Sequence, residues 1–419
     1  MTRGGSGSGA RAGRGEPALA GARVSRFSGH VSPSPNRASE SRDDGAKGER
    51  GEMRNIFRVA ETGGARRALA VVYASVLLAS VAQAQGGQET RRVVDAQAAA
   101  GTAANGSPEK TAAGPSQHEE ALRANALGSE RARAGRLAEA ITLFEQAVGY
   151  DPANPALHYN LGVAYYKVNS YDRAIKSFER AIRLRPDFAR AYNDMGRAYA
   201  DSGSPQKAAE CFERAVRLDP NLADAYNNSG ALYFDLGQYE RAVEYYQAAI
   251  HVEPDLPVTL SNLGVAYGFL DRYGEALGYL QRAVMLAPDL AVSHFNLAFV
   301  LYKLKQYKEA VNHYEWAIRL KPDYAEAYNN LGILFSDTGR DKQAADYFTR
   351  AAALKPDYAA AVYNLGMTYL KLKRKDDSIQ KYIQLKNLDA DFAARLYGAI
   401  YSDKVINAKS LGQADTARQ

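Results

Sequence analysis

The chain has 419 residues and a formal net charge of +6, and this excess lies entirely in residues 1–84, which hold 13 basic and 7 acidic residues. The rest of the chain is neutral overall, so we expect no nucleic-acid partner for the folded part. The single cysteine, Cys211, excludes an internal disulfide framework and a cysteine zinc site, and the six histidines show no metal-binding spacing. We therefore expect neither a metal nor a cofactor.

The first part of the chain has the composition of a leader. Residues 1–52 are rich in Gly, Ser and Arg, and we predict that they are disordered or lie upstream of a true start at Met53. A basic stretch follows Met53, then the uncharged apolar run ALAVVYASVLLASVA at 68–82, then Ala-Gln-Ala at 82–84. A charged region, an apolar core and a small-x-small site together are typical of a secretory signal peptide.

This pattern predicts that residues 53–84 are a signal peptide and that the chain is exported, to the periplasm or outside the cell. An uncleaved signal that anchors the chain in the inner membrane stays open as an alternative, because the uncharged stretch approaches the length of a membrane span. Residues 85–117 return to Gly, Ala, Ser and Pro without periodicity, and we predict a flexible linker there.

The rest of the chain repeats itself every 34 residues. The motif AYNNLG at 327–332 recurs with variations at this step, and prolines keep the same period. A fixed period of this size indicates stacked structural units. We number positions within the repeat from Ala121. Position 32 then holds the prolines Pro152, Pro186, Pro220, Pro254, Pro288, Pro322 and Pro356.

Within each unit the apolar residues follow helical spacing in two stretches. Position 8 is small, as at Gly332, and positions 20 and 27 are small, as at Ala344 and Ala351. Position 24 is large and apolar, as at Phe348, and a glycine such as Gly339 often marks position 15. The spacing predicts a first helix, a tight turn and a second helix that packs closely against the first.

Two sequence positions predict where one unit ends and the next begins. Proline at position 32 cannot continue the second helix. Position 33 is Asp or Asn in seven of the eight units, which predicts an N-cap for the next first helix. These residues are Asp187, Asn221, Asp255, Asp289, Asp323, Asp357 and Asp391.

The end of the array departs from the pattern. The eighth unit drifts at several small positions, as expected for a terminal unit without a neighbour to match. Residues 393–408 are predicted to form a capping helix that covers the last apolar face with Leu396, Tyr397 and Ile400, and residues 409–419 are a tail.

The combination of a 34-residue step, small residues at positions 8, 20 and 27, and proline at position 32 resembles the tetratricopeptide repeat (TPR) family. The resemblance implies an all-α fold, a right-handed superhelical solenoid of eight 34-residue helix-turn-helix units over residues 118–392, plus the C-terminal capping helix. It also implies that the first helices line a concave groove, with positions 2, 5, 6, 9, 12 and 13 turned towards it.

Position 6 carries an amide or a carboxylate in every unit but the first. A primary amide both donates and accepts, so a row of amides could pair with the backbone of an extended peptide. The row resembles that of the repeat arm of O-GlcNAc transferases, which implies peptide binding. An alternative stays open, in which each amide only bonds to the helix of the neighbouring unit. The row consists of Asn160, Asp194, Asn228, Asn262, Asn296, Asn330 and Asn364.

Apolar residues flank this row in the fifth and sixth units. Phe269, Phe295, Phe299 and Tyr302 occupy positions that the family resemblance turns towards the groove. Exposed apolar residues on such a wall usually mark a partner site, so we expect them to contact apolar side chains of a bound segment.

These features favour an exported, non-catalytic scaffold that binds an extended segment of a protein or peptide. Two other functions stay open. The chain could be an accessory, substrate-recruiting arm of a separately encoded protein glycosyltransferase, or a self-assembly module whose partner is another copy of itself. No Gly-rich phosphate loop or paired-carboxylate pattern indicates an enzyme.

The predicted signal peptide gives a direct test. We expect the mature protein, purified from the exported fraction, to begin at Gln85, because a small residue stands at each of the two positions that the signal peptidase reads. N-terminal sequencing and the intact mass measure this. A mature chain that begins at Met1 contradicts the prediction.

Overall fold

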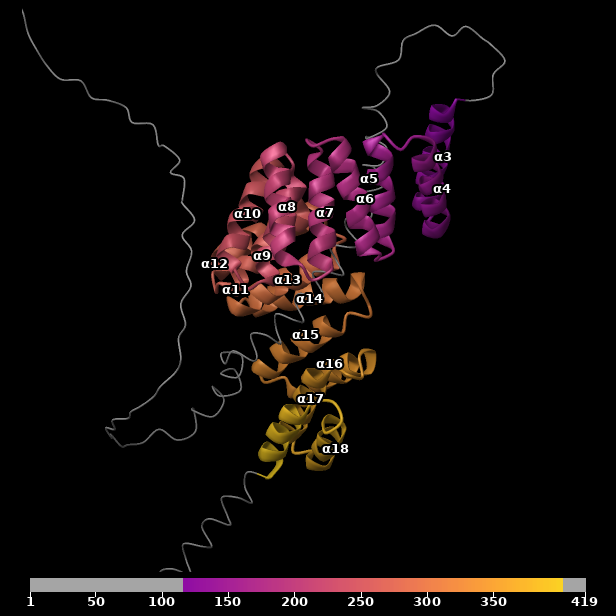
Figure 1. Cartoon of the computed structure of the whole chain (residues 1–419). Helices are drawn as coiled ribbons and strands as arrows, with labels where there is room; N and C mark the ends of the chain where they lie inside the picture. The colour runs from indigo at the N-terminus through magenta and orange to yellow at the C-terminus, as the bar shows by residue number, and fades with distance from the viewer. Residues whose placement is uncertain (1–115, 402–419) are drawn as a thin grey trace, which may run out of the picture. The chain divides into compact units, whose positions relative to one another are not determined.

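The computed structural model describes residues 116–401, and all regular secondary structure in this range is helical (Figure 1). The predicted signal segment, most of the linker and the tail lie outside the described residues. The helices are α3 (Gln117–Arg133), α4 (Leu137–Tyr150), α5 (Pro155–Lys167), α6 (Tyr171–Leu184), α7 (Ala189–Asp201), α8 (Pro205–Leu218), α9 (Ala223–Asp235), α10 (Tyr239–Val252), α11 (Pro257–Phe269), α12 (Tyr273–Leu286), α13 (Ala291–Lys303), α14 (Tyr307–Leu320), α15 (Ala325–Asp337), α16 (Asp341–Leu354), α17 (Ala359–Lys371) and α18 (Lys375–Leu385), followed by a helix over residues 390–401.

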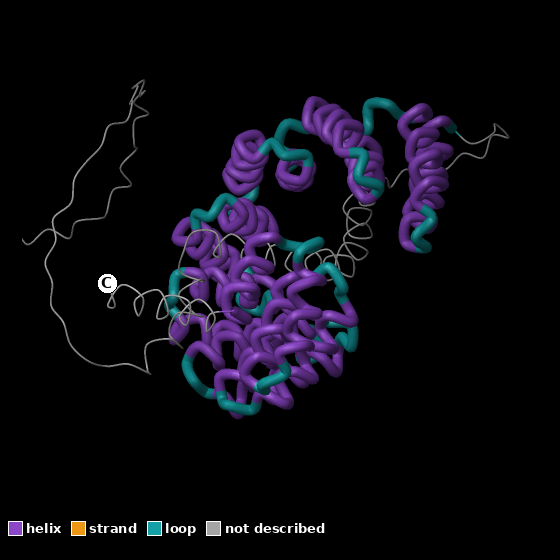
Figure 2. Tube along the Cα trace, turned by 90° about the horizontal axis from the view of Figure 1, so that it is seen from below, coloured by secondary structure: helices purple, strands orange, loops and turns teal. Residues whose placement is uncertain are grey.

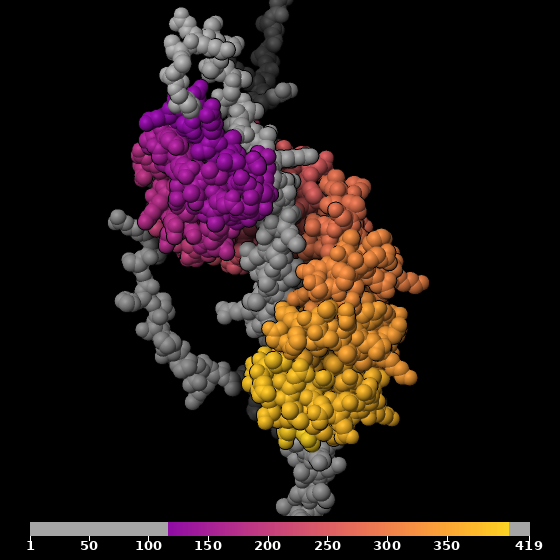
Figure 3. Space-filling model, turned by 90° about the vertical axis from the view of Figure 1, so that its right-hand side faces the viewer, coloured from indigo at the N-terminus to yellow at the C-terminus, as the bar shows by residue number. Residues whose placement is uncertain are grey.

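The helices pack in the order in which they occur along the chain. Each odd-numbered helix packs against the even-numbered helix that follows it, and that helix packs against the next odd-numbered one. Figure 2 shows the helices joined by short loops. Figure 3 shows the pairs from α15 to α18, in orange to yellow, in side-chain contact one after another. The predicted all-α solenoid of helix-turn-helix pairs is confirmed, with odd-numbered helices as first helices and even-numbered ones as second helices.

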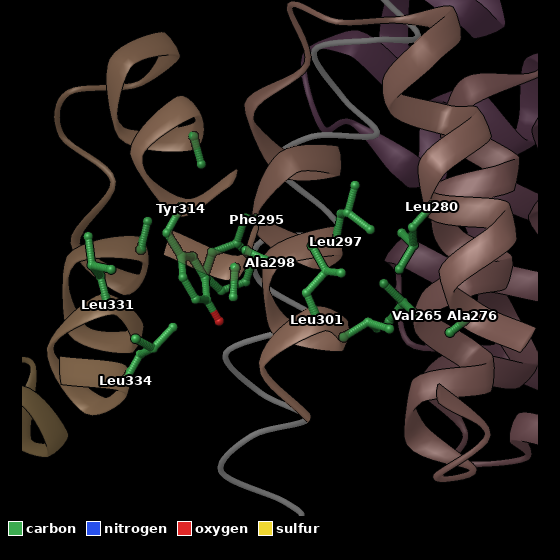
Figure 4. Close-up of a cluster of buried hydrophobic side chains, with 14 of the residues drawn as sticks. Val265, Ala276, Leu280, Phe295, Leu297, Ala298, Leu301, Tyr314, Leu331 and Leu334 are labelled. Carbon is green, nitrogen blue, oxygen red and sulfur yellow. The ribbon is translucent and has the colours of Figure 1, made fainter. Parts of the chain in front are cut away.

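The two helices of a pair meet where position 8 faces positions 20 and 24. In the α5–α6 pair, Ala174 and Phe178 are fully buried, and a Cβ added at Gly162 would lie 2.6 Å from the Phe178 ring. In the α13–α14 pair, Ala298 takes the place of the glycine beside Tyr314 (Figure 4). The small residue therefore sets how closely the helices approach, and the ring fills the space beside it.

The turn between first and second helices has the same backbone geometry in every pair. Position 15 has a positive φ whether or not it is glycine, with 74° at Gly135 and 63° at Lys305. The N–H of position 16 donates to the carbonyl of position 11, as from Gln306 to Leu301 at 2.9 Å. This bond ends the first helix in the manner of a Schellman motif, and it holds even a lysine in the left-handed region.

The predicted N-caps at position 33 are wrong: before α7 to α17 the cap lies one residue later, and Asp391 lies inside the final helix, where the N–H of Phe392 donates to Asp389 Oδ1. From α5 on, the first helices begin at position 1, so that position 34 is the N-cap, as with Phe188 before α7, whose side chain makes no capping bond. Asp187 instead accepts a backbone bond, from the N–H of Ala189 to its carbonyl at 2.9 Å. Helix α5 does have a side-chain cap: Asn154 at position 34 accepts from the N–H of Ala156. Asn221, Asp323 and Asp357 accept the same backbone bond, whereas Asp255 accepts from Arg282 through its side chain.

The helix over residues 390–401 closes the end of the array. Leu396 and Ile400 are buried as predicted, and a Cβ added at Gly366 would lie 2.5 Å from Leu396. Leu396 thus lies where the position-24 ring lies in other pairs. Tyr397 does not cover the apolar face as expected: it is 49 % exposed and packs its ring on those of Tyr382 and Tyr401.

A pair of histidines joins α13 to α14. His294 Nε2 lies 3.0 Å from the carbonyl oxygen of Pro288, and His294 Nδ1 lies 3.0 Å from His313 Nδ1. Since a carbonyl only accepts, Nε2 of His294 carries a proton and Nδ1 accepts from His313 when both rings are neutral. Burial lowers the pKa of both side chains below the ordinary 6.5, and the charge of His294 lowers that of His313 further.

The close approach of the helices predicts the effect of adding one methyl group. Gly162→Ala should lower the free energy of unfolding by about 1–3 kcal/mol, because the methyl overlaps a buried ring that has no room to move. Urea denaturation followed by circular dichroism measures the change. The matched control is Gly278→Ala in α12, where no atom lies within 4 Å of the added methyl and stability should rise by up to about 1 kcal/mol. Equal effects at both sites contradict the account.

The histidine pair predicts a dependence of stability on pH. Because both pKa values are lowered in the folded state, the unfolded chain binds more protons below pH 6.5. The free energy of unfolding should therefore fall as the pH drops through and below 6.5. Thermal melting at a series of pH values checks this. The variant His313→Gln lacks one of the two titrating rings, so its stability should fall less steeply with pH. If its melting temperature depends on pH in the same way as that of the wild type, the histidine pair is not the cause.

Candidate peptide-binding surface

The first helices form a continuous row. Besides its own second helix, each first helix also contacts the first helices beside it, from α5·α7 through α15·α17. The row therefore brings equivalent positions of successive units together. We call the side of this row that carries positions 5, 6, 9, 12 and 13 the first-helix surface.

Four of the predicted position-6 amides bond across the joint between units. The Nδ2 of each donates to the side chain at position 5 of the preceding unit. The alternative that the sequence left open, a bond to the neighbouring helix, therefore holds for these four. The bonds run from Asn160 to Asn125 Oδ1 at 2.9 Å, from Asn228 to Asn193 Oδ1 at 2.9 Å, from Asn296 to Ser261 Oγ at 3.1 Å and from Asn364 to Asn329 Oδ1 at 3.0 Å.

Asp194 is the carboxylate in the row, and three side chains hold it. Tyr159 donates to its Oδ2 at 2.6 Å, Asn193 donates to its Oδ1 at 3.1 Å, and Arg197 lies 3.5 Å from Oδ1. The carboxylate reverses the usual direction of the bond across the joint, because it accepts from position 5 where the asparagines donate.

Asn262 lies in the row without its expected bond. The side chain that it should meet, Asn227 of α9, accepts from the Thr259 hydroxyl at 3.0 Å instead. Asn262 is 4 % exposed, and within residues 116–401 its Nδ2 has no hydrogen-bond partner. Asn296 on the next first helix is equally buried, and its Oδ1 likewise has no partner in that range. An unused donor and an unused acceptor thus occur on successive helices, α11 and α13.

Asn330 also lacks an acceptor on the preceding first helix, because an aromatic residue occupies position 5 there. Position 5 of the preceding unit is Phe295, which offers no acceptor. Asn330 Oδ1 accepts from the adjacent Asn329 at 3.3 Å. Asn262 in α11 and Asn330 in α15 therefore lack the bond to position 5 of the preceding unit that the other asparagines of the row make.

The predicted aromatic residues differ in how far they are buried. Phe295 is 2 % exposed and packs on Tyr314 and Tyr324, with ring centroids 5.8 and 5.0 Å apart, so the expectation of an exposed ring is wrong for it. Val265 is buried as well. Phe295 is part of the core that joins α13 to α14.

Phe269, Phe299 and Tyr302 are only partly buried. The Phe269 ring meets Phe234 edge-on at 5.1 Å. The Tyr302 hydroxyl donates to Asp337 Oδ2 at 2.5 Å, and burial together with this bond raises the Tyr302 pKa. The three rings lie along the same part of the first-helix surface as the two unused amide atoms.

Charge is almost absent from this part of the surface. Helix α11 contains no charged residue, and α13 contains only Lys303. Acidic residues lie on both sides, at Asp235 in α9 and Asp337 in α15. Burial and the nearby Asp201 raise the pKa of Asp235 to about 6. A ligand that lies across α11 and α13 therefore meets an apolar centre between two acidic flanks.

The sequence showed the row of amides but not how each one bonds. The signal was present, because position 5 is itself Asn or Ser in five units and can accept the bond. Thr259, which diverts the bond from Asn262, occupies position 3 of its unit and carries no comparable pattern.

The remaining candidates have structural surroundings. Cys211 is buried, and burial together with Glu210 raises its pKa to about 12, which disfavours a reactive thiolate. In the described range, no cluster of three or more His, Cys, Asp or Glu side chains could hold a metal ion. None of the helices described here has the length and apolar character needed to cross a membrane.

Two family models match the sequence. One, described as the C-terminal domain of cilia and flagella-associated protein 70, matches residues 72–326, which is more than half of the chain. The other, described as tetratricopeptide repeat, matches residues 295–359 and 337–390. No curated protein matches the chain.

Several solved structures are similar to part of this chain. A chain of the APC/C hetero-tetramer Cut9–Hcn1 is 21 % identical with a TM-score of 0.50, over 59 % of this chain and 48 % of that one, so the present chain spans about half the length of that relative. PilF of Pseudomonas aeruginosa is 21 % identical with a TM-score of 0.46, over 51 % and 96 % of the two chains. YrrB, described as a TPR protein with an unusual peptide-binding site, is 23 % identical with a TM-score of 0.40, over 45 % and 97 %. Together, the helix pairs and the family models place this chain in the tetratricopeptide repeat family.

Proposed function

We propose that this chain is an interaction scaffold that holds an extended segment of a partner protein against its first-helix surface. The observation that carries the proposal is the pair of unused amide atoms, Asn262 Nδ2 and Asn296 Oδ1. A buried polar group without a partner costs about 1–3 kcal/mol. Both atoms are buried in the free chain, so a ligand recovers this free energy when it displaces the side chains that cover them and supplies their partners.

The chemistry of the two atoms matches that of a peptide backbone. Asn262 Nδ2 donates and would pair with a carbonyl, whereas Asn296 Oδ1 accepts and would pair with an N–H. Every extended peptide offers both groups, so this contact is independent of the ligand's side chains. The amides that bond across joints elsewhere in the row each already donate one N–H to the neighbouring unit.

We further propose that the scaffold acts outside the cytoplasm. The basic stretch after Met53, the apolar run at 68–82 and the Ala-Gln-Ala site at 82–84 support this. A scaffold without internal disulfides suits such a compartment because its stability does not depend on oxidation.

The amide pair can be tested with peptides selected from a random library on the full chain. Asn262→Ala and Asn296→Ala should each weaken binding of a selected peptide about five-fold, the equivalent of one hydrogen bond of about 1 kcal/mol. Fluorescence anisotropy measures the affinity. Asn262→Ala should not lower the melting temperature of the free protein, because it removes a buried donor that has no partner.

The matched control is Asn160→Ala at the same position of another unit. This change removes the bond to Asn125 and should lower the melting temperature without changing the affinity. An equal loss of affinity at Asn160 and Asn262 means that the whole row contacts the ligand. Unchanged affinity in both Asn262→Ala and Asn296→Ala refutes the proposal.

A further inference from the structure

A second row of contacts runs across the joints of the first-helix surface. Position 12 of one unit meets position 13 of the next, 35 residues later. The contacts are Tyr166 to Asp201 Oδ2 at 2.5 Å, Phe234 to Phe269 with ring centroids 5.1 Å apart, Tyr302 to Asp337 Oδ2 at 2.5 Å, and Lys371 Nζ to Ser336 Oγ at 2.6 Å.

Helix α11 lacks the side chain for this contact. Its position 12 is Gly268, between the aromatic residues Phe234 of α9 and Tyr302 of α13 at the same position. A Cβ added at Gly268 would meet no atom within 4 Å. Gly268 is the penultimate residue of α11, and no close packing requires a glycine there. The space in which a position-12 side chain would begin is open.

The residue opposite this space is Lys303, at position 13 of α13. In the described residues no carboxylate forms an ion pair with Lys303, and its Nζ lies 5.7 Å from the centroid of the Phe299 ring and 5.6 Å from that of Tyr273. A cation beside aromatic faces attracts the electron-rich face of a further ring. The same neighbourhood holds Asn262, two turns earlier on α11 than Gly268.

We propose that the partner segment supplies an aromatic side chain that fills the space in front of Gly268 and lies against Lys303. The ring would take the place that Phe234 and Tyr302 occupy in the neighbouring units. Its electron-rich face complements the ammonium group, and its apolar body suits a surface whose two helices carry no other charge. This inference rests on the proposed function, because the amide atoms of Asn262 and Asn296 hold the backbone that carries the ring.

The test begins with random short peptides displayed on phage and selected on the full chain. Peptides with Phe, Tyr or Trp at one fixed place should be enriched. The variant Gly268→Phe supplies the ring from the protein itself, and it should weaken a selected aromatic peptide by at least about 10-fold, because the space is then filled. A copy of that peptide with alanine in place of its aromatic residue should bind wild type and Gly268→Phe equally.

Two further variants make the result specific. Gly278→Phe, on the exposed side of α12, is the same substitution at another open helical glycine and should leave the affinity unchanged. Lys303→Met should weaken the aromatic peptide about two- to five-fold and leave its alanine copy unaffected, as expected for one cation–π contact. Lys303→Met also serves if Gly268→Phe fails to fold.

The outcomes separate this inference from the proposed function. If selected peptides depend on Asn262 but carry no aromatic residue, or bind Gly268→Phe as tightly as wild type, the inference is overturned and the scaffold function stands. If no peptide is enriched on wild type above the Asn262→Ala, Asn296→Ala double variant, both fall. Peptides that bind only after residues 68–82 are deleted would assign the surface to the chain's own apolar run and overturn the inference.

Discussion

The whole array depends on how closely two helices approach within each pair. Position 20 is fully buried in every pair, from Ala140 to Ser378. A larger side chain there, or at the glycine that faces it, would separate the helices and displace the ring at position 24. Each second helix also packs against the next first helix, so a change in the distance between the helices of one pair would displace the first helices that follow. The first-helix surface is in register because this approach is the same from pair to pair.

The sequence was sufficient to predict this part, because the size of a side chain at a fixed helical position determines packing directly. The 34-residue step and the small residues at positions 8, 20 and 27 predicted the pairs and their turns. The N-caps before α7 to α17 were predicted one residue early, and Asp187, Asn221, Asp323 and Asp357 accept through their backbone carbonyls instead. Burial was misjudged for Phe295, whose ring fills the core beside Tyr314 in a pair where alanine replaces the glycine.

The direction of the amide bonds could not be predicted, because it depends on competition between neighbours. Asn228 and Asn262 occupy the same position, and position 5 of the preceding unit is an asparagine for both. Only Asn228 donates to that asparagine. Asn227 Oδ1, the acceptor equivalent to the one that Asn228 uses, accepts from the Thr259 hydroxyl and not from Asn262. The repeat thus supplies identical side chains, and small differences beside them decide which amides bond across a joint and which do not.

The backbone at position 15 has a positive φ in every turn, whichever side chain the position carries. Because backbone bonds and not glycine hold the turn, this position accepts Asn169, Asp271, Lys305 and Lys373 with the same geometry. Each turn is therefore a place where the side chain can vary while the helices keep their spacing. One edge of the array is free to change its charge over evolution, and to adapt to its surroundings, without disturbing the first-helix surface.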